Sequence, residues 1–311
     1  MDRRQFLKLA ALAGVSAALL PGCVNQTPPT TPRADVGFAS GGSSPAAGEL
    51  AVAEGNDHAA ALAKGLKALG GIERFVKAGQ TVVFKPNFSV PRLPEEAATT
   101  NPVLVAALVR ACLGAGAAAV KVIDYPFTSA VICLEKTGIK QAATAAGAQV
   151  YALNGSRDRY FRAVNIGGRE LAVAEFSKDV LEADVFINMP ILKHHNMARL
   201  TMGLKNMMGL VWDRGHFHRT DLHRCIAEVA AFKKPQLTIL DAVRGITDNG
   251  PMGPGPIREW GQLVLGTDPV AVDAYGAELF GVKPAELEYL KIAAELGVGQ
   301  LAWDKLPLKR V

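Results

Sequence analysis

The chain has 311 residues, of which 49% are hydrophobic and 20% are charged, and its formal net charge is +5. This composition is typical of a globular protein with one large domain or two closely packed ones, and it excludes a fibrous or wholly disordered chain. The basic residues form no run with interleaved aromatic residues, so we expect no nucleic-acid partner.

The N-terminal segment, residues 1–23, has the pattern of a twin-arginine signal peptide. Arg3 and Arg4 precede an apolar stretch over residues 9–20. This stretch is too short to cross a bilayer, which needs about 20 residues. A signal of this kind is an address that the twin-arginine export machinery reads. We therefore expect an exported protein that works in a periplasm or at the outer face of a membrane.

The end of the signal, Leu20-Pro21-Gly22-Cys23, resembles a bacterial lipobox, in which the cysteine is lipidated. Cleavage by the ordinary signal peptidase is the alternative. Residues 24–48 are rich in Pro, Thr, Ser and Gly and cannot bury enough apolar surface to fold, so we expect a disordered tether. A lipid on Cys23 would be the only membrane contact of the folded domain, residues 49–311.

Short apolar runs alternate with helical segments from residue 49 onward. The predicted strands cover residues 50–53, 81–84, 118–123, 149–153, 184–188, 237–240 and 262–265. The predicted helices cover residues 57–69, 102–113, 131–137, 139–146, 201–208, 221–232, 269–280 and 284–296. This alternation predicts one α/β domain with a mostly parallel, Rossmann-like sheet, helices on both faces, and a small β insertion near residues 160–176.

Polar side chains follow four of these strands. In open α/β sheets, ligands bind outside the carboxyl ends of the strands, so we expect these side chains to converge around one hollow. For each residue alone, the alternative is that it caps the next helix. The residues are Lys85, Asn87, Asp124, Asp241 and, a few positions after the strand at 184–188, Lys193, His194 and His195.

Five of the six histidines fall between positions 194 and 223. Imidazole is a common metal ligand, so we interpret His194, His216 and His218 as candidate ligands of a divalent metal, to which Asp124 or Asp241 could add oxygen. Their spacing matches no zinc signature. The alternative is a set of loop histidines that bind nothing.

Lys193 and Lys205, together with Asn206, are residue types that hold a carboxylate or a phosphate. A helix that begins near Thr201 would add backbone N–H groups to such an anion site. The Gly- and Pro-rich segment over residues 248–256 is typical of a functional loop. Two further carboxylates follow this loop. Asp268 is explained as a helix N-cap, and Asp273 remains a candidate.

Several short motifs stand in a fixed order. They are Lys85-Pro86-Asn87, Thr99-Thr100-Asn101-Pro102, Pro190 to His195, Leu204 to Gly209, Asp241, Gly250-Pro251, Gly255 and Asp268 to Asp273. Over roughly residues 80–300 this order resembles the domain-of-unknown-function 362 family. The resemblance implies the fold and the positions of the motif residues, not a reaction. Many members carry a fused ferredoxin-like cysteine module. This chain has four cysteines and no C-x-x-C pair, so we expect no iron–sulfur cluster on its own cysteines.

Two hypotheses of function follow, and a purely structural role is a third. The first is an exported enzyme that acts on a small anionic substrate, with a histidine as general base. The second is a non-catalytic lipoprotein that uses the same hollow to bind a metal, a cofactor or a partner. For the enzyme, the catalytic candidates are His195, Lys193, Lys205 and Asp241, and the substrate-binding candidates are Lys85, Asn87, Asp124 and Asn206.

Overall fold

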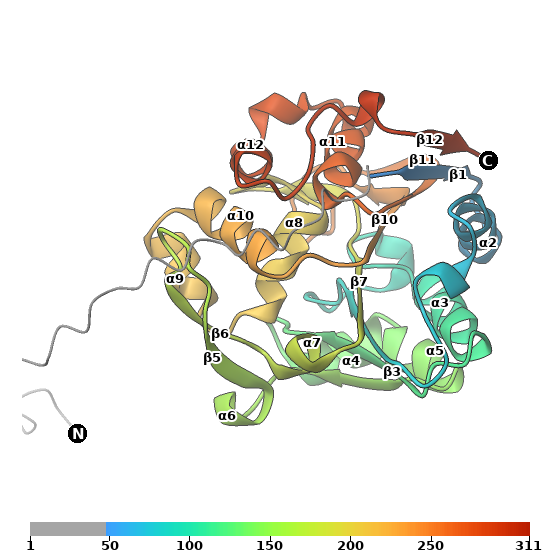
Figure 1. Ribbon diagram of the computed structural model, residues 1–311, viewed down its shortest axis with the longest axis horizontal. Coiled ribbons are helices and arrows are strands. Elements are labelled where there is room, and N and C mark those ends of the chain that lie inside the picture. Colours follow the sequence, from blue (N-terminus) through green and yellow to red (C-terminus); the bar gives the residue numbers. More distant parts are fainter. Residues whose placement is uncertain (1–47) are drawn as a thin grey trace, which may run out of the picture. The chain divides into compact units, whose positions relative to one another are not determined.

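The computed structural model describes residues 48–311 (Figure 1). The predicted signal peptide, the lipidation site Cys23 and the tether up to residue 47 lie outside the described residues. Within the described part, none of the helices combines the length and the apolar character that a membrane span requires.

A central sheet contains the strands β1 (Leu50–Glu54), β2 (Thr81–Pro86), β3 (Ala119–Asp124), β4 (Gln149–Ala152), β7 (Val185–Met189), β10 (Leu237–Ile246), β11 (Ile257–Gly266) and β12 (Leu308–Arg310). Their order is β12-β1-β11-β10-β7-β2-β3-β4. The run from β10 to β4 is parallel throughout. Strand β11 is antiparallel to both of its neighbours, and β12 joins β1 in parallel. The predicted mostly parallel sheet is confirmed.

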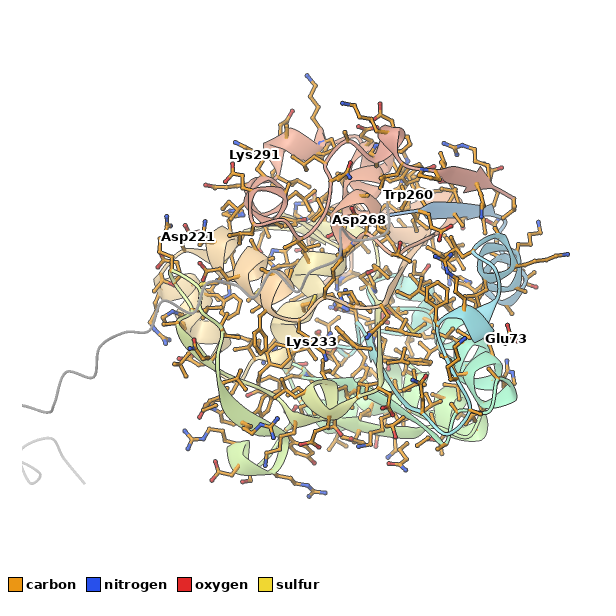
Figure 2. All side chains as sticks on the ribbon, in the orientation of Figure 1. Glu73, Asp221, Lys233, Trp260, Asp268 and Lys291 are labelled. Carbon is orange, nitrogen blue, oxygen red and sulfur yellow. The ribbon has the colours of Figure 1, made fainter. Side chains whose placement is uncertain are left out.

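Helices cover both faces of the sheet (Figure 1). One face carries α2 (His58–Ala68), α3 (Pro102–Gly114), α4 (Ala130–Lys136) and α5 (Ile139–Ala145). The other carries α8 (Gly203–Asn206), α10 (Leu222–Phe232), α11 (Pro269–Phe280) and α12 (Glu288–Glu295). Asp221 and Asp268 cap α10 and α11 by accepting backbone N–H groups (Figure 2), as Asn101 does for α3.

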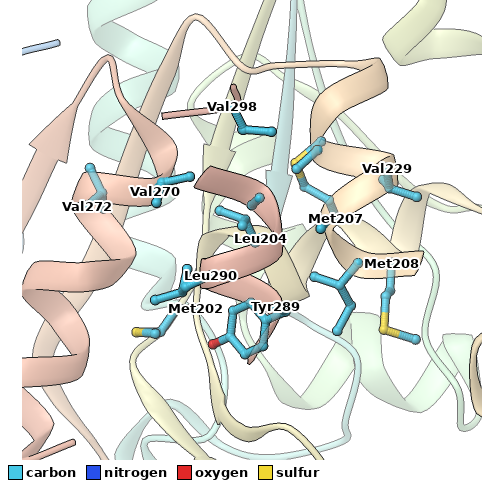
Figure 3. Packing of buried hydrophobic residues seen from close by; sticks show 14 of the residues in the cluster. Met202, Leu204, Met207, Met208, Val229, Val270, Val272, Tyr289, Leu290 and Val298 are labelled. Atoms are coloured by element: carbon cyan, nitrogen blue, oxygen red, sulfur yellow. The ribbon is translucent and has the colours of Figure 1, made fainter. Parts of the chain in front are cut away.

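The buried strands divide their side chains between two apolar cores. In β10, Ile239 and Val243 face the core under α2 and α3, whereas Leu240 and Ala242 face the core under α8 and α11. This alternation follows from the period of two along a strand. Because both faces are buried, the strands read as continuous apolar runs. Figure 3 shows the second core, where Leu204 lies near Tyr289 and Leu290 of α12.

Two small hairpins project from this frame. The first pairs β5 (Phe161–Asn165) with β6 (Val173–Ser177), which confirms the predicted insertion. The second pairs β8 (Lys193–His195) with β9 (Arg199–Thr201). Thr201 therefore belongs to a strand, and the helix predicted from residue 201 begins at Gly203 as α8 and continues as a 3₁₀ turn, Met207–Leu210.

Candidate functional site

A cavity of about 550 Å³ lies beside the segment that follows β2. The β8–β9 hairpin, α8 with its 3₁₀ turn, α9 (Arg214–Arg219) and the loop over residues 248–256 form its walls. The polar side chains that line it include Asn87, Lys193, His195, Thr201, Lys205, Asn206, Arg214 and His218. Most of the predicted site residues therefore meet here, but they do not play equal parts.

A buried ion pair stabilises the segments that line the cavity. The Lys85 ammonium lies 2.7 Å from Asp124 Oδ1, 3.0 Å from Asn206 Oδ1 and 2.9 Å from the Pro86 carbonyl oxygen. Burial lowers the pKa of Lys85, and the Asp124 carboxylate opposes that decrease. A lysine has three N–H donors, and all three have partners here. Lys85 therefore has no donor left for a ligand, and its contacts join β2 to β3 and α8.

Asp124 is equally occupied. Besides Lys85, it accepts hydrogen bonds from the backbone N–H groups of Phe88 and Tyr125 and from the Ser89 hydroxyl, at 2.9, 2.7 and 2.9 Å. A Cβ on Gly209 would lie only 2.6 Å from Asp124 Oδ1, so the 3₁₀ turn can pass this close only with glycine. Lys85 and Asp124, which we predicted to contact substrate, instead form the support beneath the cavity.

Asn206 joins three elements of the fold. Its Oδ1 accepts hydrogen bonds from Lys85 and from Asn87 Nδ2, and its Nδ2 donates to the Lys85 carbonyl and to Asn188 Oδ1 of β7. These four bonds use the full capacity of the amide. Asn206 therefore fixes α8 to the ends of β2 and β7, and Lys205, its neighbour in α8, is placed in the cavity.

Lys193 lines the cavity from β8. Its ammonium donates to the carbonyl oxygens of Ala98 and Pro251, at 2.5 and 3.0 Å, and lies 3.4 Å from Asn87 Oδ1. Burial lowers the pKa of Lys193, with Lys205 and Lys85 adding to the decrease and Asp124 opposing it. The three oxygen acceptors favour the ammonium form, so we infer that Lys193 keeps its proton at neutral pH.

Lys205 differs from the other two lysines. Its half-buried side chain lines the cavity and makes no hydrogen bond or ion pair with any group of residues 48–311. Desolvation by the surrounding protein lowers the pKa of Lys205 to about 7, and the positive charges of Arg214 and Lys85 add to the decrease. A bound anion would offset both effects, because it supplies the missing opposite charge.

The start of α8 is closed to a ligand. Both oxygens of the buried Asp273 carboxylate accept backbone N–H groups there, from Gly203 at 2.7 Å and from Leu204 at 2.8 Å. Burial raises the pKa of Asp273 to about 7, and these two hydrogen bonds oppose that increase. The expectation that this helix start would offer N–H groups to an anion is wrong, since Asp273 already occupies them.

His195 presents an N–H group to the cavity. Its Nδ1 accepts hydrogen bonds from the backbone N–H groups of Met197 and Ala198, at 3.1 and 3.2 Å. The ring proton is therefore assigned to Nε2. Burial lowers the pKa of His195 far below its usual range, and the charges of Lys205 and Lys193 add to this. A neutral imidazole with its proton on Nε2 is a hydrogen-bond donor, which does not suit the general-base role expected for His195.

The three candidate metal ligands do not converge. His194 Nδ1 accepts a hydrogen bond from the Gly250 N–H at 3.0 Å, whereas His216 Nε2 lies 2.9 Å from the Glu170 carbonyl oxygen. Of the three, His218 alone lines the cavity. Within residues 48–311, no three or more His, Cys, Asp or Glu side chains are grouped so that they could hold a metal ion. The predicted set is therefore not assembled.

Asp241 lies away from the cavity. Its Oδ1 is 3.2 Å from His58 Nε2 of α2, and its Oδ2 accepts the Asn101 N–H at the start of α3. The alternation along β10 places Asp241 on the same face as Ile239 and Val243, opposite to α8. The predicted convergence of Asp241 with Lys193 and His195 is wrong for this reason.

Two important lining residues were not among the predicted site residues. Arg214 donates to the Tyr125 carbonyl at 2.6 Å, and its guanidinium lies 3.9 Å from the centre of the Tyr125 ring. Thr201 is paired with Lys193 across the hairpin, and its buried Oγ1 has no hydrogen-bond partner in the described part of the chain. In the sequence, Thr201 could have been identified only from its spacing to Lys205. Arg214 could have been identified only from its position in the histidine-rich segment.

Comparison with known proteins identifies the family. Residues 82–278 match the family described as Domain of unknown function (DUF362). The thylakoid-associated protein sll1697 of Synechocystis sp. is 30% identical over 245 residues, which cover 76% of this chain and 74% of that protein.

Two solved structures are more distant. The lactate racemase apoprotein from Thermoanaerobacterium thermosaccharolyticum has a TM-score of 0.49 and 13% identity, over 74% of this chain and 56% of that one. A protein from Thermotoga maritima has a TM-score of 0.45 and 10% identity, over 78% of this chain and 60% of that one. In both, the match spans less than two thirds of the solved chain. On the family match and the Synechocystis relative, this chain belongs to the DUF362 family.

Proposed function

We propose that this protein is an enzyme that acts on a small anionic substrate, a carboxylate or a phosphate, in the cavity beside α8. One observation carries the proposal: the Lys205 ammonium group lines this cavity without any partner among residues 48–311. A cation withdrawn from bulk water without a counter-ion is costly. An anionic ligand would remove that cost, because it would supply the charge that the protein does not.

Hydrogen-bond donors around Lys205 support this proposal. The Nε2–H of His195 and the unpartnered hydroxyl of Thr201 belong to one hairpin, to which the Lys193 ammonium, whose three donors contact protein oxygens, adds positive charge. Among the described residues that line the cavity, Asp213 is the one acid, and its carboxylate accepts hydrogen bonds from Arg219 and from the backbone at the start of α9. The cavity is therefore positive and rich in donors, as an anion site requires.

Lys205 is also suited to proton transfer. A pKa of about 7 means that both its neutral and its charged forms are present near neutral pH. An anion bound beside it would favour the ammonium form, which could then donate its proton to the substrate. In this mechanism Lys205 is the general acid, His195 and Thr201 orient the anion, Lys193 contributes positive charge, and Asp241 takes no part.

The same proposal includes an exported protein held at a membrane. It is supported by the twin-arginine pattern of residues 1–23 and by the relative in Synechocystis, which is named as thylakoid-associated. A lipid on Cys23 would supply the attachment.

Binding and turnover of small acids test the site. We would titrate acetate and inorganic phosphate into the full chain and into Lys205→Met by calorimetry, with Lys291→Met, an exposed lysine of α12, as the control (Figure 2). Circular dichroism would verify folding. We expect Lys205→Met to weaken binding about 10- to 100-fold, since a hydrogen bond to a charged group contributes about 1.5–3 kcal/mol. Unchanged binding in Lys205→Met would refute the proposal.

A turnover screen separates the enzyme from a binding protein. Wild type and Lys205→Met would each be incubated with a pool of small carboxylates and phosphate esters, and the products followed by mass spectrometry. Turnover that is lost in Lys205→Met supports an enzyme. Binding without turnover of any member of the pool would instead favour the non-catalytic binding protein.

A further inference from the structure

Large apolar side chains gather at the mouth of the same cavity. Phe127, Met197 and Met252 are 49%, 54% and 37% exposed, and all three line the cavity. They come from three separate segments: the chain after β3, the turn between β8 and β9, and the loop over residues 248–256. Exposed apolar residues are usually scattered singly over a surface, whereas a cluster at one opening marks a binding site.

The apolar surface continues from this rim toward the cationic floor. Trp212 and Met208 also line the cavity, and the Trp212 ring stacks on Tyr125 with 5.6 Å between ring centroids and 8° between planes. This aromatic pair forms a rigid wall, and methionine side chains can adapt to ligands of different shape. One end of the cavity therefore suits a charge, and the other suits an apolar group.

The size of the cavity agrees with this division. Its volume is about 550 Å³. Pockets of about 300–1,000 Å³ typically enclose drug-sized ligands, which are much larger than acetate or phosphate. Acetate or inorganic phosphate would occupy the floor beside Lys205 and leave the apolar wall and rim exposed to water. A ligand with an apolar body would cover them and gain the hydrophobic contribution.

We propose that the ligand of this cavity is an amphiphilic carboxylate, whose head group binds between Lys205 and Thr201 and whose apolar body lies along Trp212 and reaches Phe127, Met197 and Met252. This inference rests on the proposed function, because it takes the same cavity as the site. It adds that the apolar rim selects the substrate, and that hydrophilic anions of equal charge bind more weakly.

Calorimetric titration of the full chain with acetate and hexanoate tests the inference. The two probes share one head group and differ by four methylene groups. We expect hexanoate to bind wild type about 10- to 200-fold more tightly, because a buried methylene contributes about 0.8 kcal/mol and the four extra methylene groups are half to fully covered. The double variant Met197→Gln/Met252→Gln keeps the side-chain length but makes the rim polar. It should lose about tenfold in hexanoate affinity and keep its acetate affinity, whereas Val173→Thr, an exposed apolar control on β6, should change neither.

The outcomes separate this inference from the function on which it rests. If acetate and hexanoate bind wild type equally and Lys205→Met weakens both, the anion site stands and the amphiphilic ligand is refuted. An equal loss of both probes in the rim double variant would also refute it. If neither probe binds wild type more tightly than Lys205→Met, the proposed function and this inference both fail.

Discussion

Raising the pH should weaken anion binding through one group, Lys205. Desolvation and the charges of Arg214 and Lys85 lower the pKa of Lys205 to about 7 in the empty cavity. An anion beside the ammonium raises this pKa again, because it favours the charged form. Below pH 7 the proton is already present before binding. Above pH 7 it has to be taken up from solvent as the anion binds.

The sign and size of the effect follow from this linkage. Affinity is constant below pH 7 and falls about tenfold for each pH unit above it, until the pH reaches the pKa of Lys205 in the complex. One unit corresponds to about 1.36 kcal/mol, so between pH 7 and pH 9 binding weakens by about 2.7 kcal/mol, or about a hundredfold. The oxygen acceptors around Lys193 keep that second lysine charged, so the slope should be near one proton rather than two.

Calorimetry with hexanoate, which does not titrate in this range, measures the slope. Repeating the titration at pH 8 in two buffers of different ionisation enthalpy counts the protons, and we expect about one proton taken up per anion. Lys205→Gln should bind weakly and without pH dependence, whereas Lys291→Gln should keep the wild-type slope. A flat wild-type profile between pH 7 and pH 9, or an unchanged slope in Lys205→Gln, would show that Lys205 is not the group beside the anion.

Three further substitutions test the support and the anchor. Gly209→Ala should lower the free energy of unfolding, measured in denaturant, by about 1–3 kcal/mol, because the added Cβ would meet Asp124. The matched control is Gly114→Ala at the end of α3, where a Cβ meets nothing within 4 Å, and it should not destabilise the protein. Asp273→Asn should lower the free energy of unfolding by about 1–3 kcal/mol, because one backbone N–H of α8 loses its acceptor. It should also weaken anion binding. An unchanged free energy of unfolding would contradict the capping role of Asp273. Cys23→Ser should move the exported protein from the membrane fraction to the soluble fraction, and retention at the membrane would exclude the lipid anchor.

Local rules in the sequence predicted much of the fold. Apolar runs bounded by polar residues identified seven of the eight strands of the central sheet, all but β12, and Asn101 and Asp268 beside prolines located the starts of α3 and α11. Parallel strands also implied a shared edge, and Lys193, His195, Lys205 and Asn206 do meet at one cavity. These properties depend on residues near one another in the chain, so a single sequence is enough to reveal them.

The roles within the site depend on contacts between distant residues. Asp241 and Lys85 are both polar residues of buried strands, but the alternation along each strand sends Asp241 to the α2 and α3 face and Lys85 to the α8 face. Lys85 and Lys205 are both cations withdrawn from bulk water, and only tertiary packing gave one of them Asp124 and left the other without a partner among residues 48–311. Residue types and spacing indicated some of the groups that reach the cavity, namely Lys193, His195, Lys205 and Asn206. The pairing of charges and hydrogen bonds in three dimensions decided which of these groups remain available to a ligand. The sequence does not reveal this pairing, because it joins distant segments: Lys85 and Asn206 lie 121 positions apart in the chain.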